Sequence, residues 1–321
     1  MQPHKRNFCG GNFQDWLEVN LTDKCNGRCS WCIEKDGYHP KKHVNWRVMV
    51  RQALNSGKTN IILLGGEPTL YGDISRVIRA LRMAFRKVWI TTNGGIMSPA
   101  YVMDTLVGVT GVNVSVHDSD LIRNKTVTGV SISDLEGTIV ALHKIGATVR
   151  LNCNCILGHI DSAKAIGQYV AFAKSVGADK VRFAELKQDK ERFVDLAEVM
   201  DYQYGLNDNP FVDGCNNDAV IDGIPVSFRQ MCGFQTPKRP TPKLSKGFAG
   251  YEKQVLYYDG RFYNGWQTEV AGMKGKKLGS LLEDVANGKV SSQEAQKVIC
   301  KREKKRAKRV AAVDSGGYCR Y

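Results

Sequence analysis

Short apolar segments that alternate with longer amphipathic ones constrain the fold of this chain more than any other feature. The apolar segments have the length and the flanking turn residues of buried strands, and the longer ones space their apolar residues as helices do. The strand-like segments are residues 16–21, 60–64, 87–92, 112–116, 148–157 and 180–186. The helix-like segments are residues 44–54, 72–85, 131–145 and 161–176, with another that begins at Ser98-Pro99. This alternation predicts a parallel sheet with helices outside it, as an open doubly wound sheet or as a barrel.

Three cysteines follow the first strand-like segment at the spacing C-x3-C-x2-C, as Cys25, Cys29 and Cys32. Cysteine thiolates hold iron–sulfur clusters, and a tight loop brings several sulfurs to one face of a cluster. Three ligands leave one iron of a four-iron cubane to a distant residue or to a small molecule. A disulfide would leave one of the three cysteines unpaired, and a zinc site would need a fourth ligand. The nearest additional candidates for zinc are Cys9, His39 and His43.

The second strand-like segment ends in Gly65-Gly66-Glu67-Pro68. Two glycines let a ligand approach the backbone closely, Glu67 offers a carboxylate, and Pro68 stiffens the turn. With these two motifs in this order, the chain resembles a radical S-adenosylmethionine (radical SAM) enzyme over about residues 15–190. In that superfamily the cysteine loop follows the first strand of the barrel and the GGEP motif follows the second.

This resemblance implies an α/β fold, a partial (βα)6 parallel barrel with a small α+β C-terminal extension. It implies a [4Fe–4S] cluster on Cys25, Cys29 and Cys32, with the methionine part of S-adenosylmethionine on the fourth iron. Gly65, Gly66 and Glu67 would contact the amino group of that methionine. The cofactor would lie at the carboxyl ends of the strands, where ligands bind in parallel α/β folds. An external electron donor such as flavodoxin or ferredoxin would reduce the cluster.

Further cofactor contacts are expected where the strand-like segments end. The resemblance makes Ser115 a contact of the ribose or the carboxylate of S-adenosylmethionine, and it places Trp31 near the adenine. Asn154 and the backbone near Leu186 are candidates for the ribose and the adenine. The other expected cofactor-binding residues, which follow the third strand-like segment, are Thr92 and Asn93. Each polar residue is also open to the simpler interpretation of turn or cap formation.

His117 and Asp118 follow the fourth strand-like segment and are the candidate catalytic residues. A histidine at a strand end can take and release protons near neutral pH.

The chain is expected to divide into an N-terminal arm (residues 1–14), the barrel (15–190) and a C-terminal substrate or accessory region (191–321). Asp222-Gly223 and Asp259-Gly260 predict two hairpins in the last part. The second hairpin resembles the twitch or SPASM extension of some radical SAM enzymes, with Gly265 where that extension has a cluster-binding cysteine. Four cysteines outside the core could hold a second iron–sulfur cluster, or be simple thiols. They are Cys215, Cys232, Cys300 and Cys319.

The chain is strongly basic, with 46 Lys and Arg against 32 Asp and Glu, a net charge of +14. Residues 301–309 (KREKKRAKR) form the most basic segment, which is compatible with a terminal helix. This balance favours a polyanionic partner, with nucleic acid as the first candidate. Because no apolar run of about 18 residues and no secretory signal occur, we expect no membrane span and a cytoplasmic location, the host cytoplasm if a virus encodes the chain.

Together these features predict an enzyme that cleaves S-adenosylmethionine reductively to a 5′-deoxyadenosyl radical, which takes a hydrogen atom from a nucleic-acid base or a nucleotide. One such reaction is virus-type hypermodification of thymidine in DNA, by isomerisation or rearrangement. The alternative enzymes are a peptide-modifying one and one of the molybdopterin-precursor type. The alternative without enzymatic activity is a cluster-containing nucleic-acid-binding or antiviral protein that does not turn over S-adenosylmethionine.

Overall fold

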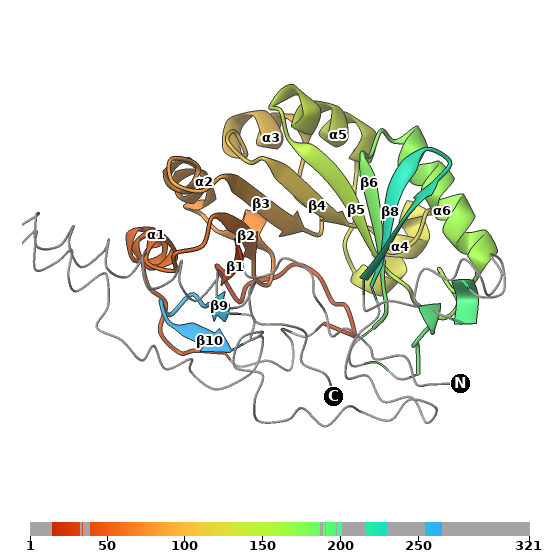
Figure 1. Ribbon diagram of the computed structural model, residues 1–321, viewed down its shortest axis with the longest axis horizontal. Coiled ribbons are helices and arrows are strands. Elements are labelled where there is room, and N and C mark those ends of the chain that lie inside the picture. The colour runs from red at the N-terminus through yellow and green to blue at the C-terminus, as the bar shows by residue number, and fades with distance from the viewer. Residues whose placement is uncertain are drawn as a thin grey trace, which may run out of the picture. The chain divides into compact units, whose positions relative to one another are not determined.

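One curved sheet of ten strands organises the part of the chain that the computed structural model describes (Figure 1). That part comprises residues 15–32, 34, 39–186, 189, 191–196, 198–200, 216–229 and 254–264. The first six strands are β1 (Trp16–Asn20), β2 (Asn60–Leu64), β3 (Lys87–Thr92), β4 (Gly111–Ser115), β5 (Thr148–Asn154) and β6 (Lys180–Ala184). The other four are β7 (Asn216–Ile221), β8 (Ile224–Arg229), β9 (Gln254–Leu256) and β10 (Phe262–Asn264).

The strand order decides between the two architectures that the sequence left open. Strands β1 to β6 are parallel and lie next to one another in chain order, within the sheet order β10-β9-β1-β2-β3-β4-β5-β6-β8-β7. A doubly wound sheet reverses its strand order at a switch point and carries helices on both faces. Here there is no such reversal, and the helices follow the convex face (Figure 1). The fold is therefore a partial barrel of the expected (βα)6 type.

The helices begin and end close to the positions that the sequence indicates. They are α1 (Trp46–Leu54), α2 (Ile74–Arg82), α3 (Pro99–Thr105), α4 (Leu121–Thr128), α5 (Leu135–Lys144) and α6 (Ala163–Ser175), with the short helix η2 (Pro68–Leu70) after β2. Ser98 caps α3 as predicted, because its side chain accepts a hydrogen bond from Tyr101 N and Pro99 follows at the first helical position. Helix α4 was not predicted, since its sequence LIRNKTVT has no clear apolar stripe.

The two faces of the sheet differ in character, as strand β5 illustrates. Val149, Leu151 and Cys153 are buried in the main apolar core beneath the helices, so Cys153 is a core residue as its position in the strand suggests. Arg150 and Asn152 alternate with them on the opposite face, which we call the inner face of the barrel. The inner face is therefore polar where the outer face is apolar.

The two predicted hairpins are both present, and both extend the barrel sheet. The β7–β8 hairpin turns at Asp222 and Gly223, whose φ angles of 49° and 82° are both positive, as a two-residue hairpin turn requires. Strand β8 pairs in parallel with β6, and β9 of the second hairpin pairs in parallel with β1. The compact unit that contains the barrel extends over residues 1–271, whereas we expected the barrel to end near residue 190.

Several sequence predictions lie outside the described residues. They concern the N-terminal arm (1–14), the cysteines at 215, 232, 300 and 319, position 265, and the basic segment 301–309. The second compact unit, residues 272–321, lies there as a whole.

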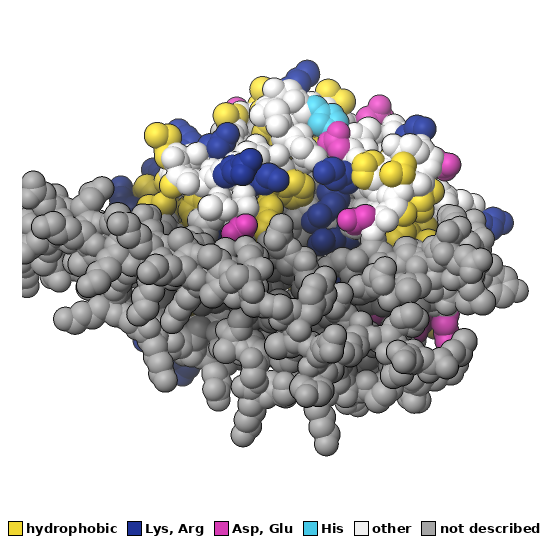
Figure 2. Space-filling model, in the orientation of Figure 1, with side chains coloured by type: hydrophobic (Ala, Val, Ile, Leu, Met, Phe, Trp, Pro, Cys, Tyr) yellow, Lys and Arg dark blue, Asp and Glu magenta, His cyan; other side chains and the backbone are white. Residues whose placement is uncertain are grey.

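On the face that Figure 2 shows, Lys and Arg side chains form several separate groups, with single Asp or Glu side chains between them. None of the helices that the structure describes is both long enough and apolar enough to cross a bilayer.

Candidate functional site

The cysteine loop is fixed to the end of β2 by main-chain hydrogen bonds. Gly66 N donates to Thr22 O at 2.7 Å, and Glu67 N donates to Lys24 O at 2.7 Å. A Cβ on Gly65 would lie 2.6 Å from Thr22 O, and one on Gly66 would clash with Lys24 O. The two glycines are therefore required for the close approach of the cysteine loop itself, in addition to any ligand.

The three cysteines of the loop are free thiols of differing exposure. Cys25 is exposed, and Cys29 and Cys32 are half-buried. Gly27 N donates to Cys25 Sγ at 3.2 Å. Partial burial raises the pKa of the Cys25 thiol, although this hydrogen bond opposes the shift. Binding of a metal would therefore release a proton from Cys25.

Glu67 is 1% exposed, and its carboxylate joins β2 to the end of β3. Its oxygens accept hydrogen bonds from Thr69 Oγ1 at 2.6 Å, Thr92 Oγ1 at 2.7 Å and Asn93 N at 2.7 Å. Burial raises the pKa of Glu67, and these bonds oppose the shift. The structure thus brings Glu67, Thr92 and Asn93 together, but it gives this carboxylate a task within the fold that the sequence did not reveal.

Asn93 connects the end of β3 to the cysteine loop. Its Nδ2 donates to Asn26 Oδ1 at 2.7 Å and lies 3.9 Å from Cys25 Sγ. Its Oδ1 accepts from Gly95 N at 2.9 Å. Asn93 was predicted as a cofactor contact, and here it holds the segment that carries the first cysteine.

Helix α4 supports the other side of the cysteine loop. Asp120 caps the helix by accepting hydrogen bonds from Ile122 N and Arg123 N. At the other end, Thr128 O accepts from Arg28 N at 2.6 Å. The helix therefore braces the loop between Cys25 and Cys29.

Trp31 and Leu186 lie together, as expected for two residues near one cofactor group. They form a small buried apolar cluster with Ile156, which follows β5. The ring of Trp31 also meets the ring of His117 edge to face, with centroids 5.4 Å apart. Ile156 is a member of this group that the sequence analysis missed.

His117 has a geometry that does not support the expected acid–base role. Its side chain is buried, and Nδ1 accepts a hydrogen bond from Asn154 N at 3.0 Å. Burial, with a smaller effect of His159, lowers the pKa of His117 to about 4. The imidazole is therefore neutral at pH 7, and it supports the end of β5 where Asn154 lies.

The carboxylate of Asp118 also binds neighbouring residues of the fold. Its Oδ2 lies 2.7 Å from His159 Nδ1 and 3.3 Å from Arg123 Nε, and its Oδ1 accepts from Asp120 N at 2.9 Å. Because the carboxylate is buried and its partners are in place, it is a poor candidate for proton transfer to a substrate. In this geometry His117 and Asp118 both position neighbouring segments, and their catalytic role stays a prediction.

The expected contact of Ser115 with the cofactor stays a prediction. It is half-buried at the carboxyl end of β4, and its hydroxyl has no hydrogen bond to another described residue. In the sheet it is in register with Asn152, whose Oδ1 accepts from Arg150 Nε at 3.0 Å. Ser115 therefore offers a hydroxyl group at the edge of the barrel where a ligand would bind.

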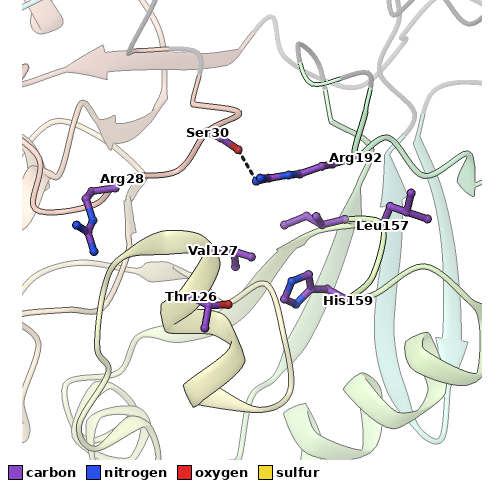
Figure 3. Close-up of a pocket in the computed structure, with 8 residues that line it drawn as sticks. Arg28, Ser30, Thr126, Val127, Leu157, His159 and Arg192 are labelled. Carbon is purple, nitrogen blue, oxygen red and sulfur yellow. Dashed lines mark hydrogen bonds between the residues drawn. The ribbon is translucent and has the colours of Figure 1, made fainter.

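A cavity of about 450 Å³, whose lining residues Figure 3 shows, shares Ile156 with the Trp31 cluster. The cysteine loop, helix α4 and the segment after β5 contribute to its wall, together with Arg192, which donates to Ser30 Oγ at 2.7 Å. Its lining residues are Arg28, Ser30, Thr126, Val127, Ile156, Leu157, His159 and Arg192. Its lining is mostly polar or charged, and Val127, Ile156 and Leu157 are its apolar members. A cavity of this size with several polar groups is a candidate site for a small molecule. No local motif marks these residues, so the sequence analysis did not find the cavity.

The cysteine loop fits a cluster better than a single ion. Within the described part of the chain, no three His, Cys, Asp or Glu side chains are grouped to hold one metal ion. In a [4Fe–4S] cluster each thiolate binds a different iron, so the sulfurs need not converge on one point. Three free thiols in one braced loop satisfy this requirement.

Comparisons with known proteins agree with this geometry. The profile of the Radical SAM superfamily matches residues 19–171. A probable GTP 3′,8-cyclase of Sulfolobus acidocaldarius is 29% identical over 201 residues, which are 60% of this chain and 64% of the relative. The GTP 3′,8-cyclase of Haemophilus ducreyi is 27% identical over 186 residues, 55% of this chain and 54% of the relative. The chain thus spans less than two thirds of the length of these relatives.

Solved structures share the fold. Streptococcus suis SuiB bound to S-adenosylmethionine superposes with a TM-score of 0.54 at 18% identity, over 88% of this chain and 67% of that one. The structure of anSMEcpe with bound AdoMet and the Cp18Cys peptide has a TM-score of 0.50 at 16% identity, over 87% of this chain and 79% of that one.

Proposed function

The chain belongs to the radical SAM superfamily through residues 19–171, and on this premise we propose that it holds a [4Fe–4S] cluster on Cys25, Cys29 and Cys32. The observation that carries the proposal is the attachment of these free thiols to the GGEP end of β2 by main-chain hydrogen bonds. When bound and reduced by an external flavodoxin or ferredoxin, the cluster supplies the electron that cleaves S-adenosylmethionine to methionine and a 5′-deoxyadenosyl radical, which removes a hydrogen atom from the substrate.

The chain's own residues would bind and orient S-adenosylmethionine. The backbone at Gly65 and Gly66 would receive its methionine part next to the cysteine loop. The Ser115 hydroxyl would bind the ribose or the carboxylate, with Asn154 as a further ribose contact. The adenine would pack against Trp31 in the neighbouring cavity, near the Leu186 backbone.

We propose a nucleic-acid base or a nucleotide as the substrate. The net charge of +14 supports this, because a basic protein attracts polyanions. The curated relatives named above act, by their names, on GTP, which is a nucleotide. Hypermodification of thymidine in DNA is a reaction of this kind, and the basic segment 301–309 would contribute phosphate contacts.

A molybdopterin-precursor activity of the GTP 3′,8-cyclase type is the second candidate. The 29% identity over 60% of this chain supports it. Incubation with GTP separates the two proposals: cyclisation of GTP would establish the second, and turnover of a thymidine nucleotide or of DNA without it would establish the first. A peptide substrate would remain unchanged in either case.

The cluster proposal is tested by the iron content of the anaerobically reconstituted chain. We expect about four irons per wild-type chain and formation of 5′-deoxyadenosine with dithionite, both lost in a Cys25/Cys29/Cys32→Ala variant. Cys153→Ala is the control, because this buried thiol lies outside the loop and its loss should leave the iron content unchanged.

Two other outcomes of this experiment would have a different meaning. A full cluster without release of 5′-deoxyadenosine would contradict the enzymatic proposal and favour a binding protein. About eight irons, half of them kept in the triple variant, would indicate a second iron–sulfur cluster on other cysteines.

A further inference from the structure

Three arginines occupy the inner face of the barrel on adjacent strands. Arg150 lies on β5, Arg182 on β6 and Arg229 on β8. Each alternates with residues of the main core, such as Leu151, Phe183 and Phe228, so all three side chains belong to the face opposite the helices.

The register places the three arginines on one diagonal of the sheet. Arg150 is level with Lys180, Arg182 lies two residues further along β6, and Arg229 is level with Ala184, another two residues on. With strands ~4.8 Å apart and a rise of ~3.3 Å per residue, successive members of this row have Cα atoms about 8 Å apart. Long guanidinium side chains at that spacing can reach one common ligand.

The row places three positive charges close to one another. Burial, with smaller effects of Arg182 and Arg229, lowers the pKa of Arg150 to about 9. Burial, together with Arg229, also lowers the pKa of Arg182 to about 10. Asp218 on β7 opposes both shifts, and Glu18 on β1 opposes that of Arg182. Arg150 and Arg182 are thus largely withdrawn from water next to other cations, and a bound anion would stabilise them.

The side chains of the row also lack some of the hydrogen bonds that they could make. Arg182 Nε is buried and has no hydrogen-bond partner among the residues that the structure describes. Arg150 donates one bond, to Asn152 Oδ1, and its guanidinium lies over the Trp89 ring at 5.3 Å from the centroid. Asn113, which pairs with Arg150 in the sheet, also has a buried oxygen without a partner. Buried polar atoms are rarely left unpaired, so these atoms on the inner face of the barrel point to a ligand.

We propose that Arg150, Arg182 and Arg229 bind the phosphate of a nucleotide substrate on the inner face of the barrel. Planar guanidinium groups pair with phosphate through two parallel hydrogen bonds, and three of them provide donors for a group with several oxygens. The inference rests on the proposed function, whose nucleotide substrate it deepens.

The site lies within reach of the reaction centre. Arg182, Asn152 and Ser115 are level with one another on three adjacent strands. Two strand spacings separate Arg182 from Ser115, about 10 Å between backbones. A nucleotide held by its phosphate at Arg182 would therefore extend its sugar and base toward the strand ends, where S-adenosylmethionine would bind.

The experiment is calorimetric titration of the reconstituted full chain, with S-adenosylmethionine present, using inorganic pyrophosphate as the probe. We expect Arg182→Gln to weaken pyrophosphate binding about tenfold or more, since one charge-assisted bidentate contact is lost. Added salt should weaken binding to the wild type more than binding to the variant, because salt screens the attraction between charges. Arg76→Gln is the matched control, because Arg76 is exposed on α2 and pairs only locally with Asp73.

Two further arms identify the source of the phosphate. Thymidine 5′-triphosphate against thymidine, and GTP against guanosine, test a free nucleotide, and a single-stranded oligonucleotide tests nucleic acid. Stronger binding of either phosphorylated class than of the nucleosides, lost in Arg182→Gln, supports the proposal and names the source.

Equal binding of pyrophosphate to wild type and Arg182→Gln would overturn the proposal. So would no binding to wild type together with a lower melting temperature of Arg182→Gln, because the arginine would then pair within the chain. Formation of 5′-deoxyadenosine is measured in the same samples. If it forms while phosphate does not bind, only the phosphate site fails. If phosphate binds and no 5′-deoxyadenosine forms, only the enzymatic proposal fails.

Discussion

At the scale of single residues, the polar groups around the cysteine loop are mostly occupied by the fold. Glu67 receives hydrogen bonds from the ends of two strands, and Asp118 is paired with His159 and Arg123. The hydroxyl of Ser115, at the end of β4, has no hydrogen bond to another described residue and is available to a ligand. The residues that build a site can therefore be separated from those that meet its ligand.

Glu67→Gln should destabilise the protein. The amide would place a donor among groups that already donate, Thr69, Thr92 and Asn93 N. We expect the free energy of unfolding to fall by about 1–3 kcal/mol, because a buried donor is left unpaired. Urea unfolding of the cluster-free chain measures this. Glu191→Gln is the exposed control and should change little; equal losses in the two variants would contradict the role assigned to Glu67.

His117 should make stability depend on pH. Its pKa is about 4 in the folded chain and near 6.5 when unfolded, so between these values the unfolded chain binds more protons. Stability therefore rises with pH, and the cluster-free chain should lose about 2 kcal/mol from this group between pH 7 and pH 5. Urea unfolding at the two pH values of wild type and His117→Gln measures the difference.

The exposed Ser133 supplies the control for that experiment, because a serine hydroxyl does not titrate between pH 5 and pH 7. Ser133→Ala should keep the wild-type dependence on pH, whereas His117→Gln should flatten it. An unchanged dependence in His117→Gln would show that the buried imidazole is protonated in the folded chain.

At the scale of elements, the end of β2 and the cysteine loop form one unit. The loop lies so close to Gly65 and Gly66 that side chains there would meet its carbonyl oxygens. Helix α4 holds the opposite side of the loop through Thr128 O. The cysteine loop is thus held between a strand end and a helix that come from different parts of the chain.

Gly66→Ala should displace the cysteine loop. Its Cβ would meet the main chain at Asp23 and Lys24, which cannot move without breaking the loop's hydrogen bonds. We expect a loss of about 1–3 kcal/mol in unfolding free energy and less iron per chain after reconstitution. Gly72→Ala is the matched control, since nothing lies within 4 Å of its Cβ position. Full iron content in Gly66→Ala would show that the loop tolerates the shift.

At the scale of the whole molecule, the segments after residue 190 complete the barrel sheet. Strands β8 and β9 pair with β6 and β1, the two strands that would otherwise be edges. Exposed edges of a sheet favour aggregation, so the hairpins have a structural role whatever they do for a substrate. They also bring Arg229 to the inner face beside Arg182.

A chain truncated to residues 15–190 should therefore aggregate or melt at a lower temperature than one of residues 1–271, the compact unit of the structure. Size-exclusion chromatography and thermal unfolding followed by circular dichroism compare the two. A monomeric 15–190 chain with the same melting temperature would restore the boundary expected from the sequence.

The sequence by itself determined the local features: the cysteine spacing, the GGEP turn, the alternation of strands with helices, the Ser98-Pro99 helix start and the two Asp-Gly hairpins. Each depends on residues within one turn or one segment, where spacing and backbone preference are sufficient. Only the tertiary structure decided which strands are neighbours. That choice formed the partial barrel, joined Glu67 to Thr92, buried His117 and aligned three arginines from separate strands. Periodicity shows which face a residue occupies, but the partner across that face depends on contacts between distant parts of the chain.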